Sequence, residues 1–321
     1  MASEQEDQPV FYDALIHQRR RHGHYRTIDG PLPPLEHPLA DSHCHLASLS
    51  QRDLSLARAA LWKVDFICDI TDPIEDAGRT YTQLPAWELS ARSWMSVIAP
   101  ETEASLPRIR LACGCHPHNA KDFTEFVEAR LITHLKDERT CCMGEVGLDY
   151  HYDLSPRDLQ QQVFRRQIQL AHESGLPIAL HVREAHEEAL AILDDEGFPA
   201  AGTILHCCSL SPHDLEPWLD RGCSIAYGGA LTFKKLDEAR EGMKMVPIDR
   251  LLLETDCPYM TPEPLRGTEN SPEFIVFTAA RLAAERGISA GDDRRDFLAT
   301  LHANTLSLLD RPATSWQTHT S

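Results

Sequence analysis

The sequence predicts an α/β fold in which short buried strands alternate with helices around one core. Eight apolar runs of strand length follow one another along the chain, and stretches with helical spacing separate most of them. The runs are continuously apolar, which is typical of parallel strands that are buried on both faces. Eight such units predict a (β/α)8 TIM barrel.

The predicted strands cover residues 39–45, 66–70, 109–115, 141–146, 177–182, 203–208, 223–227 and 251–255. An open, doubly wound sheet is the competing architecture, and it would bind a nucleotide through a glycine-rich turn after the first strand. The first strand here instead runs into Asp41-Ser42-His43-Cys44-His45, and the chain contains no GxGxxG motif. These observations favour the barrel.

The clearest predicted helix covers residues 157–174, where Leu159, Val163 and Ile168 recur at helical spacing. Further helices are predicted over residues 122–135, 184–195, 211–221, 233–245 and 273–285. All but the last of these helices lie between apolar runs, as the crossover helices that parallel strands require do, and the last follows the final run.

The chain of 321 residues is long enough for one barrel domain, which we place at residues 39–310. Residues 1–38 form a short N-terminal extension, with a short helix predicted over residues 11–18. The prolines at positions 31, 33, 34 and 38 exclude a continuous helix in the rest of this extension. Residues 311–321 are left as a C-terminal tail.

The charge of the chain restricts its partners. With 31 basic and 49 acidic side chains, the net charge is −18, which opposes a broad electrostatic grip on duplex DNA. A nucleic-acid substrate must therefore be bound locally. The most basic run, Arg19-Arg20-Arg21 with His22 and His24, is interpreted as a solvated arm.

The cysteines and the N-terminus predict a cytoplasmic protein. Ten cysteines are present, none of them in a CxxC motif, and most lie within apolar runs, so buried thiols are expected. The polar first residues lack the apolar segment of a secretory signal, and no apolar run reaches the length of a membrane span. No membrane association and no obligate protein partner are expected.

Potential metal ligands recur where the predicted strands end, which is the face on which barrel enzymes place functional groups. The six are His43, His45, Glu145, His181, His206 and Asp256. Side chains at i and i+2 of a strand share a face, so His43 and His45 can converge on one ion. Six nitrogen and oxygen ligands exceed one open site and suit two ions bridged by a carboxylate. The alternative is that they are separately satisfied histidines among the seventeen in the chain.

The chain resembles the TatD family of metal-dependent hydrolases, within the amidohydrolase-like barrels, from about residue 38 to about residue 310. The resemblance rests on Asp41-Ser42-His43-Cys44-His45-Leu46, Gly114-Cys115-His116-Pro117-His118, Gly144-Glu145-Val146-Gly147-Leu148-Asp149-Tyr150, Leu180-His181-Val182-Arg183, Leu205-His206-Cys207-Cys208-Ser209, Glu254-Thr255-Asp256-Cys257-Pro258-Tyr259, Arg266-Gly267 and Asn270 to Asn304. Order and spacing are preserved throughout.

The resemblance implies a role for each predicted ligand. His43, His45 and Asp256 would bind one divalent ion, His181 and His206 a second, and Glu145 both. Asp256 and Glu145 would be the catalytic residues, with Asp256 accepting a proton from the attacking water. The ions expected are two per chain, with Zn²⁺, Mn²⁺, Mg²⁺, Fe²⁺ or Ni²⁺ as candidates, and the substrate expected is DNA.

Two further residues are predicted to bind substrate. The family motif around His118 resembles a contact to substrate phosphate. Arg183 lies two residues after His181 on the same strand, and its planar guanidinium matches phosphate oxygens. A structural ion pair is the alternative for Arg183.

Some positions depart from the family pattern. The family usually has phenylalanine and then serine after the histidine at position 206, whereas this chain has Cys207-Cys208-Ser209, which would reshape the rim of the pocket. Cys44 and Cys257 adjoin predicted ligands, but strand alternation points both away from the ligand face, so they are expected to pack in the core.

Three functions follow from these observations. The first is a two-metal phosphodiesterase or deoxyribonuclease that acts on DNA ends or short single-stranded oligonucleotides. The alternative is hydrolysis of a small amide, lactone or phosphoester metabolite, because related barrels use the same His-x-His pair and final aspartate. Many of those enzymes bridge their metals with a carboxylated lysine, and Glu145 in its place favours the nuclease. The third is a catalytically silent barrel that acts as a binding module.

Overall fold

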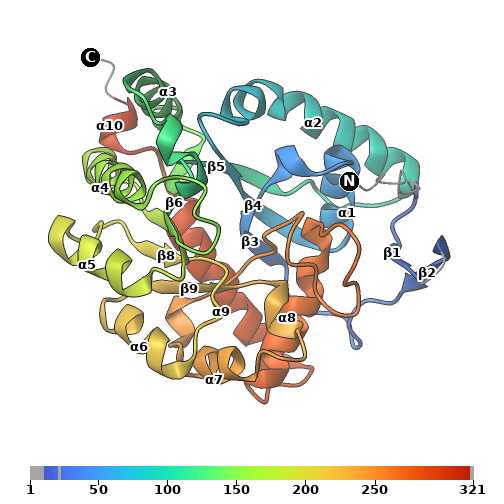
Figure 1. The fold of residues 1–321 in the computed structure, drawn as a ribbon. Coiled ribbons are helices and arrows are strands. Elements are labelled where there is room, and N and C mark those ends of the chain that lie inside the picture. Colours follow the sequence, from blue (N-terminus) through green and yellow to red (C-terminus); the bar gives the residue numbers. More distant parts are fainter. Residues whose placement is uncertain (1–10, 21–22, 319–321) are drawn as a thin grey trace.

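The eight predicted strands form one parallel sheet that curls into a barrel, with helices around it (Figure 1). The computed structural model describes residues 11–20 and 23–318. Neighbouring strands pair in chain order, which confirms the predicted barrel. The strands are β3 (Leu39–Cys44), β4 (Val64–Thr71), β5 (Arg108–Cys113), β6 (Thr140–Asp149), β7 (Ile178–Arg183), β8 (Thr203–Leu205), β9 (Ser224–Tyr227) and β10 (Leu251–Leu253).

The barrel closes where the first and last strands meet. The N–H of Asp256 donates to the carbonyl oxygen of His43 (2.9 Å), and the N–H of His45 donates to that of Cys257 (2.8 Å). Beneath them, the hydroxyl and the N–H of Thr255 donate to the carboxylate of Asp41 at 2.5 and 2.9 Å. These bonds hold the end of β3 beside the segment that follows β10.

Apolar side chains from all eight strands form a separate buried cluster, which fills the interior of the barrel. Ala179 of β7 and Ile204 of β8 belong to it. His181 and His206 follow two residues later, so the two-residue period of a strand places them on the same interior face, nearer the carboxyl ends. The packed interior thus forms a floor beneath the polar residues.

The six predicted helices are present. Helix α4 begins and ends at the predicted residues, and the others differ by a few residues at their ends. The helices are α1 (Arg52–Leu61), α2 (Ala77–Ile98), α3 (Glu125–Leu135), α4 (Arg157–Ser174), α5 (His186–Glu196), α6 (Pro212–Asp220), α7 (Asp237–Met245), α8 (Ile275–Glu285), α9 (Asp292–Leu309) and α10 (Ser315–Thr318). Helices α1, α2 and α9 complete the outer ring.

The predicted helix over residues 11–18 is wrong. Ile16–Arg19 is a strand, β1, which pairs antiparallel with β2 (Tyr25–Ile28). Ile16 is buried against Leu265 and Phe274, so one apolar side chain anchors the segment, and pairing with β2 supplies the backbone hydrogen bonds. Of the basic run, residues 21 and 22 lie outside the described residues, whereas Arg19 lies in β1.

The extension is tied to the barrel through a buried arginine. Nε and Nη2 of Arg294, in α9, donate to the two carboxylate oxygens of Glu36 at 2.6 and 2.7 Å. Nη2 also donates to the carbonyl oxygens of Pro33 and Pro34, both at 3.0 Å. The hydrogen bond from Arg294 lowers the pKa of Glu36 from 4.5 to about 2.

Glu36→Gln is expected to lower the free energy of unfolding at pH 7 by about 2 kcal/mol, because a buried guanidinium loses its charged acceptor. The pKa of Glu36 is lower in the folded chain than in the unfolded chain, so its stabilisation is complete above pH 4.5 and is lost as the pH falls toward 2. Urea unfolding of both proteins at pH 7 and pH 3.5 should show a smaller difference at pH 3.5. The exposed Glu238→Gln is the control, and a difference that does not vary with pH would contradict this assignment.

Candidate metal centre

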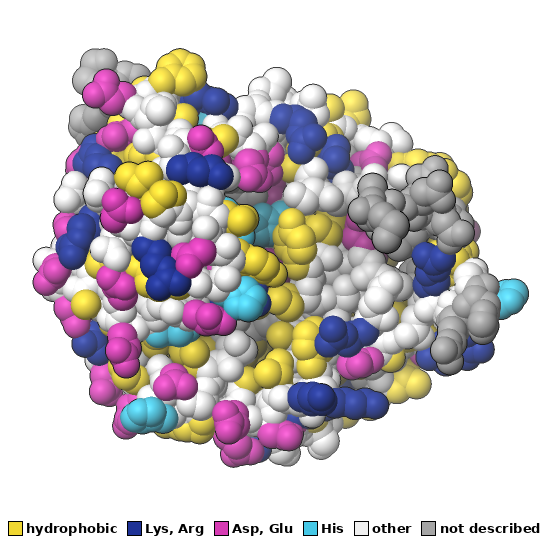
Figure 2. Space-filling view, in the orientation of Figure 1, with side chains coloured by type: hydrophobic (Ala, Val, Ile, Leu, Met, Phe, Trp, Pro, Cys, Tyr) yellow, Lys and Arg dark blue, Asp and Glu magenta, His cyan; other side chains and the backbone are white. Residues whose placement is uncertain are grey.

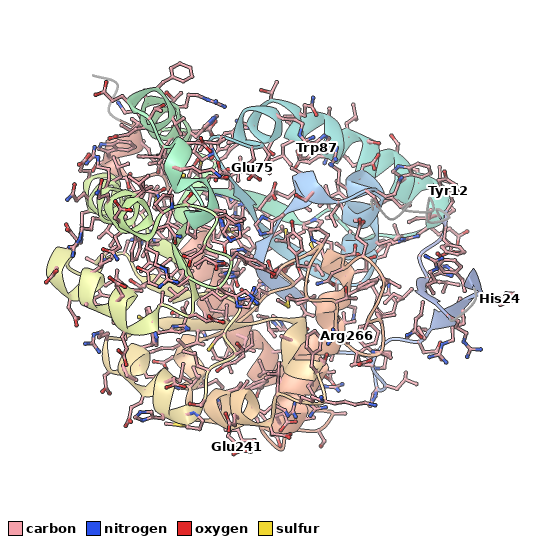
Figure 3. The ribbon with its side chains drawn as sticks, in the orientation of Figure 1. Tyr12, His24, Glu75, Trp87, Glu241 and Arg266 are labelled. Carbon is pink, nitrogen blue, oxygen red and sulfur yellow. The ribbon has the colours of Figure 1, made fainter. Side chains whose placement is uncertain are left out.

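The six predicted ligands meet at the carboxyl ends of the strands, inside the rim of the barrel. His43 lies within β3 and His45 directly after it, Glu145 lies within β6, His181 within β7, His206 directly after β8 and Asp256 after β10. Figure 2 shows histidine surface within the hollow of this face, and Figure 3 shows side-chain nitrogen atoms gathered at the centre of the barrel.

The carboxylate of Glu145 stands between two pairs of histidines. Its Oε1 atom lies 2.6 Å from Nδ1 of His181 and 2.7 Å from Nε2 of His206. Its Oε2 atom lies 3.4 Å from Nε2 of His43 and 3.8 Å from Nε2 of His45. Each carboxylate oxygen therefore faces a different pair, which is the arrangement that a bridging carboxylate requires.

The side chains fall into two groups whose potential ligand atoms lie within 4.8 Å of one another: His43, His45 and Asp256, and Glu145, His181 and His206. Nε2 of His45 is 3.5 Å from Oδ1 of Asp256. Nε2 of His43 is buried and makes no hydrogen bond to any described residue, so a bound cation would satisfy it. Imidazole and carboxylate together suit first-row divalent metals, so the residues present fit divalent metal ions.

The buried carboxylate at this centre requires positive charge beside it. Burial raises the pKa of Glu145, but the histidines around it, His206 and His181 above all, lower that pKa well below its usual value. Burial lowers the pKa of His206, and Glu145 more than reverses this and raises it. A carboxylate buried this deeply is stable only beside cations, and divalent ions supply that charge without protonating the histidines.

Local backbone conformation allows the strands to approach closely here. Gly147 of β6 pairs with His181 of β7, and a Cβ atom at Gly147 would lie 2.0 Å from the carbonyl oxygen of His181. Gly147 also has φ of +143°, so glycine is required there. Asp256 and Cys207 have φ of +56° and +48°, in the left-handed region that non-glycine residues seldom adopt and that is typical of functional segments.

The two predicted substrate-binding residues lie on the β6–β7 side of this centre. Nε2 of His118, in the 3-10 helix η3 (Pro117–Asp122), lies 3.0 Å from Oδ2 of Asp149. The guanidinium of Arg183 lies 4.8 Å from the centre of the exposed Tyr152 ring, and that ring contacts His118 edge to face. No ion pair joins Arg183 to any described residue.

Three further residues adjoin the centre without having been assigned from the sequence. Nε2 of His116 is 3.8 Å from Oε1 of Glu145, and Asp149 and Glu254 lie beside His181 and His206. Asp149 lies four residues after Glu145 on β6, and Glu254 two residues before Asp256. The two-residue period of a strand therefore signals both carboxylates, whereas His116 lies in a motif in which only His118 is predicted to bind substrate.

The cysteines beside the predicted ligands pack in the core, as predicted. Cys44 and Cys257 are fully buried within the main apolar cluster, and burial raises the pKa of both thiols. None of the potential metal-binding groups among the described residues contains a cysteine. Nine of the ten cysteines are buried and Cys207 is half-buried; all ten are unpaired thiols.

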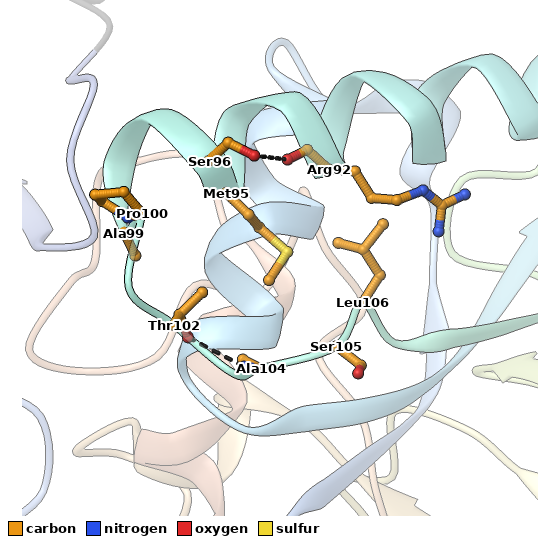
Figure 4. Close-up of a pocket in the computed structure, with 9 residues that line it drawn as sticks. All are labelled: Arg92, Met95, Ser96, Ala99, Pro100, Thr102, Ala104, Ser105 and Leu106. Atoms are coloured by element: carbon orange, nitrogen blue, oxygen red, sulfur yellow. Dashed lines mark hydrogen bonds between the residues drawn. The ribbon is translucent and has the colours of Figure 1, made fainter.

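A surface pocket of about 380 Å³ lies apart from this centre (Figure 4). It is formed by the last turns of α2 and the segment that leads into β5, with Met95 and Leu106 among its lining residues. That segment enters β5 at its amino end, so the pocket lies toward the opposite end of the barrel from the histidines. No helix in the described part of the chain is both long and apolar enough to cross a membrane.

Comparison with known proteins identifies the family. The family described as "TatD related DNase" matches residues 40–309. YcfH of Escherichia coli K12, named an uncharacterized metal-dependent hydrolase, is 32% identical over 257 residues, 78% of this chain and 89% of YcfH. TatD of Pantoea vagans, named a 3'-5' ssDNA/RNA exonuclease, is 34% identical over 182 residues, 55% of this chain and 70% of that protein.

A solved structure agrees with these sequences. The crystal structure of YJJV, a TatD homologue from Escherichia coli K12, superposes with a TM-score of 0.72 at 25% identity, covering 85% of this chain and 98% of YJJV. The match to the family extends over most of the barrel, and the chain therefore belongs to the TatD family of metal-dependent hydrolases.

Proposed function

We propose that this protein hydrolyses phosphodiester bonds at the ends of DNA or of short single-stranded oligonucleotides, with two divalent ions bound at the centre. The observation that carries the proposal is the position of Glu145, whose two oxygens face separate pairs of histidines. The family described as TatD related DNase and the exonuclease name of the Pantoea relative support nucleic acid as the substrate.

Each residue has a role in this proposal. His43, His45 and Asp256 would hold one ion, His181 and His206 the other, and Glu145 both. When bound, two such ions neutralise charge on the phosphoryl oxygens and generate a nucleophile from water. The candidates remain Zn²⁺, Mn²⁺, Mg²⁺, Fe²⁺ and Ni²⁺.

Asp256 would accept the proton of the attacking water. Burial raises the pKa of Asp256, but the hydrogen bond from His45 and the charges of His206 and His43 lower it overall, so the side chain is a carboxylate able to accept a proton. His118 and Arg183 would contact the phosphates of the substrate from the β6–β7 side. Ten unpaired cysteines support a cytoplasmic location as part of the same proposal.

The test is release of nucleotides from end-labelled single-stranded DNA in the presence of Mn²⁺ or Mg²⁺, with and without EDTA. Metal-dependent shortening from one end supports the proposal. If the protein binds two ions but leaves DNA and RNA intact while it hydrolyses a lactone, amide or phosphomonoester, the metabolite hydrolase replaces it. A protein that binds no ion and is not activated by Mn²⁺ would be a silent barrel.

Arg183→Lys is expected to raise KM for a short oligonucleotide about 10-fold with little change in kcat, because lysine cannot form the bidentate contact that a guanidinium makes with phosphate. Initial rates over a range of oligonucleotide concentrations measure this.

Arg157→Lys is the matched control for Arg183→Lys. The Arg157 guanidinium also stacks on a tyrosine of the same loop, 4.3 Å from the Tyr150 ring, but pairs with Asp153. It should leave KM unchanged. Equal effects of the two substitutions would assign Arg183 a structural role.

A further inference from the structure

Two buried carboxylates stand behind the two histidines that face Oε1 of Glu145. His181 turns Nδ1 toward Glu145, and its other ring nitrogen, Nε2, lies 2.9 Å from Oδ2 of Asp149. His206 turns Nε2 toward Glu145, and its Nδ1 lies 3.7 Å from Oε2 of Glu254. Both carboxylates are fully buried.

The carboxylate of Asp149 is held by the backbone around it. Its Oδ1 atom accepts the N–H groups of His151 and Tyr152 at 3.0 and 2.8 Å, which leaves Oδ2 for His181 and His118. Gln160 of α4 accepts the N–H of Asp149 at 2.8 Å and donates to its carbonyl oxygen at 3.2 Å. Helix α4 thereby fixes Asp149, and Asp149 fixes the ring of His181.

Glu254 is held in a similar way with fewer bonds. Its Oε1 atom accepts the N–H of Cys207 at 2.7 Å, and its buried Oε2 atom has no hydrogen-bond partner among the described residues. The Nδ1 atom of His206 is likewise buried without a partner. The two unsatisfied atoms face one another, so a small rotation of the ring would join them.

We propose that Asp149 and Glu254 are positioning residues that set the tautomers of His181 and His206, so that Nδ1 of His181 and Nε2 of His206 keep free lone pairs for one ion. A carboxylate accepts only, so the ring nitrogen that faces Asp149 or Glu254 carries the proton, and with an ion bound the opposite nitrogen would give its lone pair to that ion. Carboxylates in this position also make the ligating nitrogen more basic. The inference rests on the proposed metal centre and concerns only the ion shared by Glu145, His181 and His206.

Amide substitutions distinguish this role from simple packing. In Asp149→Asn, an amide group placed toward His181 donates to Nε2, which moves the ring proton to Nδ1, where the ion would bind. If the amide turns over, its NH2 group opposes the N–H groups of His151 and Tyr152. In Glu254→Gln, the amide oxygen keeps the N–H of Cys207 while NH2 faces His206, which reverses that tautomer without a competing clash.

The experiment is calorimetric titration of the chelator-treated, full-length protein with Zn²⁺. Wild-type protein is expected to bind two ions, and each amide variant is expected to bind one of them about 10- to 100-fold more weakly while the other is unchanged. Glu75→Gln is the matched control, because it makes the same acid-to-amide change at an exposed position (labelled in Figure 3) where Glu75 accepts a hydrogen bond from Asn119. NMR of ¹⁵N-labelled histidine gives a second readout, since the two tautomers have distinct nitrogen shifts.

The outcomes separate this inference from the proposed function. If wild-type protein binds no ion, the metal centre itself is overturned. If it binds two and both amide variants bind them with wild-type affinity, Asp149 and Glu254 do not position the histidines. A third ion in wild-type protein that Asp149→Asn removes would make Asp149 a direct ligand with His118 and His181, which also overturns the inference. Glu254→Gln keeps the test decisive if Asp149→Asn does not fold.

Discussion

Glu145→Gln is expected to abolish binding of both ions and to lower the rate of DNA cleavage about 1,000-fold or more. Among the described residues, this carboxylate faces both pairs of histidines, so its loss would remove a ligand from each proposed ion at once. Glutamine has nearly the same shape, but its NH2 group would face one pair as a donor and could not ligate, and its carbonyl oxygen would offer the other pair's ion no negative charge. The expected fall in the rate of DNA cleavage corresponds to the loss of several kcal/mol of transition-state stabilisation by the ions.

Metal content after dialysis and the rate on end-labelled oligonucleotide measure the effect of Glu145→Gln. Glu75→Gln, at an exposed position of the same rim, should keep two ions and wild-type activity. Glu145→Asp tests whether the length of the side chain matters, because a side chain shorter by one methylene cannot contact both pairs of histidines from the same backbone position. A Glu145→Gln protein that retains two ions would show that the carboxylate does not bridge them.

The centre could be predicted from the sequence because its residues obey the geometry of a parallel barrel. His181 and His206 each lie two residues after an apolar side chain of the barrel interior. The two-residue period that predicts a buried strand therefore also places these two histidines at the carboxyl end of that interior. The order of the strands also follows the chain, so the predicted ligands converge as expected from their strand positions alone. The resemblance to the TatD family rests on these same segments.

The elements and contacts that the sequence does not predict depend on residues that are distant in the chain. Helix α2 contains Pro85 in its interior, which opposes a helix assignment, and its burial against α1 outweighs that preference. The strand at Ile16 exists because of contacts with Leu265 and Phe274, about 250 residues away. Asp149 was visible in its motif, but only the structure places its carboxylate behind His181.

Asp256→Asn is expected to lower the rate of DNA cleavage about 100- to 10,000-fold, because proton transfer by a positioned group contributes that much. Among the described residues, Asp256 forms an ion pair with His45, at 3.5 Å, and unlike Glu145 it forms none with the other three histidines. It belongs to one of the two ligand groups. The ion shared by Glu145, His181 and His206 should therefore be retained, and the affinity for oligonucleotide, measured by fluorescence anisotropy, should change little.

The number of ions that each variant binds then distinguishes the role of Glu145 from that of Asp256, which the rate of DNA cleavage alone cannot do. Glu145→Gln should leave no tightly bound ion, whereas Asp256→Asn should leave at least one and still bind the substrate. If Asp256→Asn cleaves DNA at the wild-type rate, the proton acceptor lies elsewhere in the centre, and His116, with Nε2 at 3.8 Å from Glu145, is the side chain to replace next. If it loses both ions, Asp256 holds the centre together, and the division of ligands around Glu145 must be redrawn.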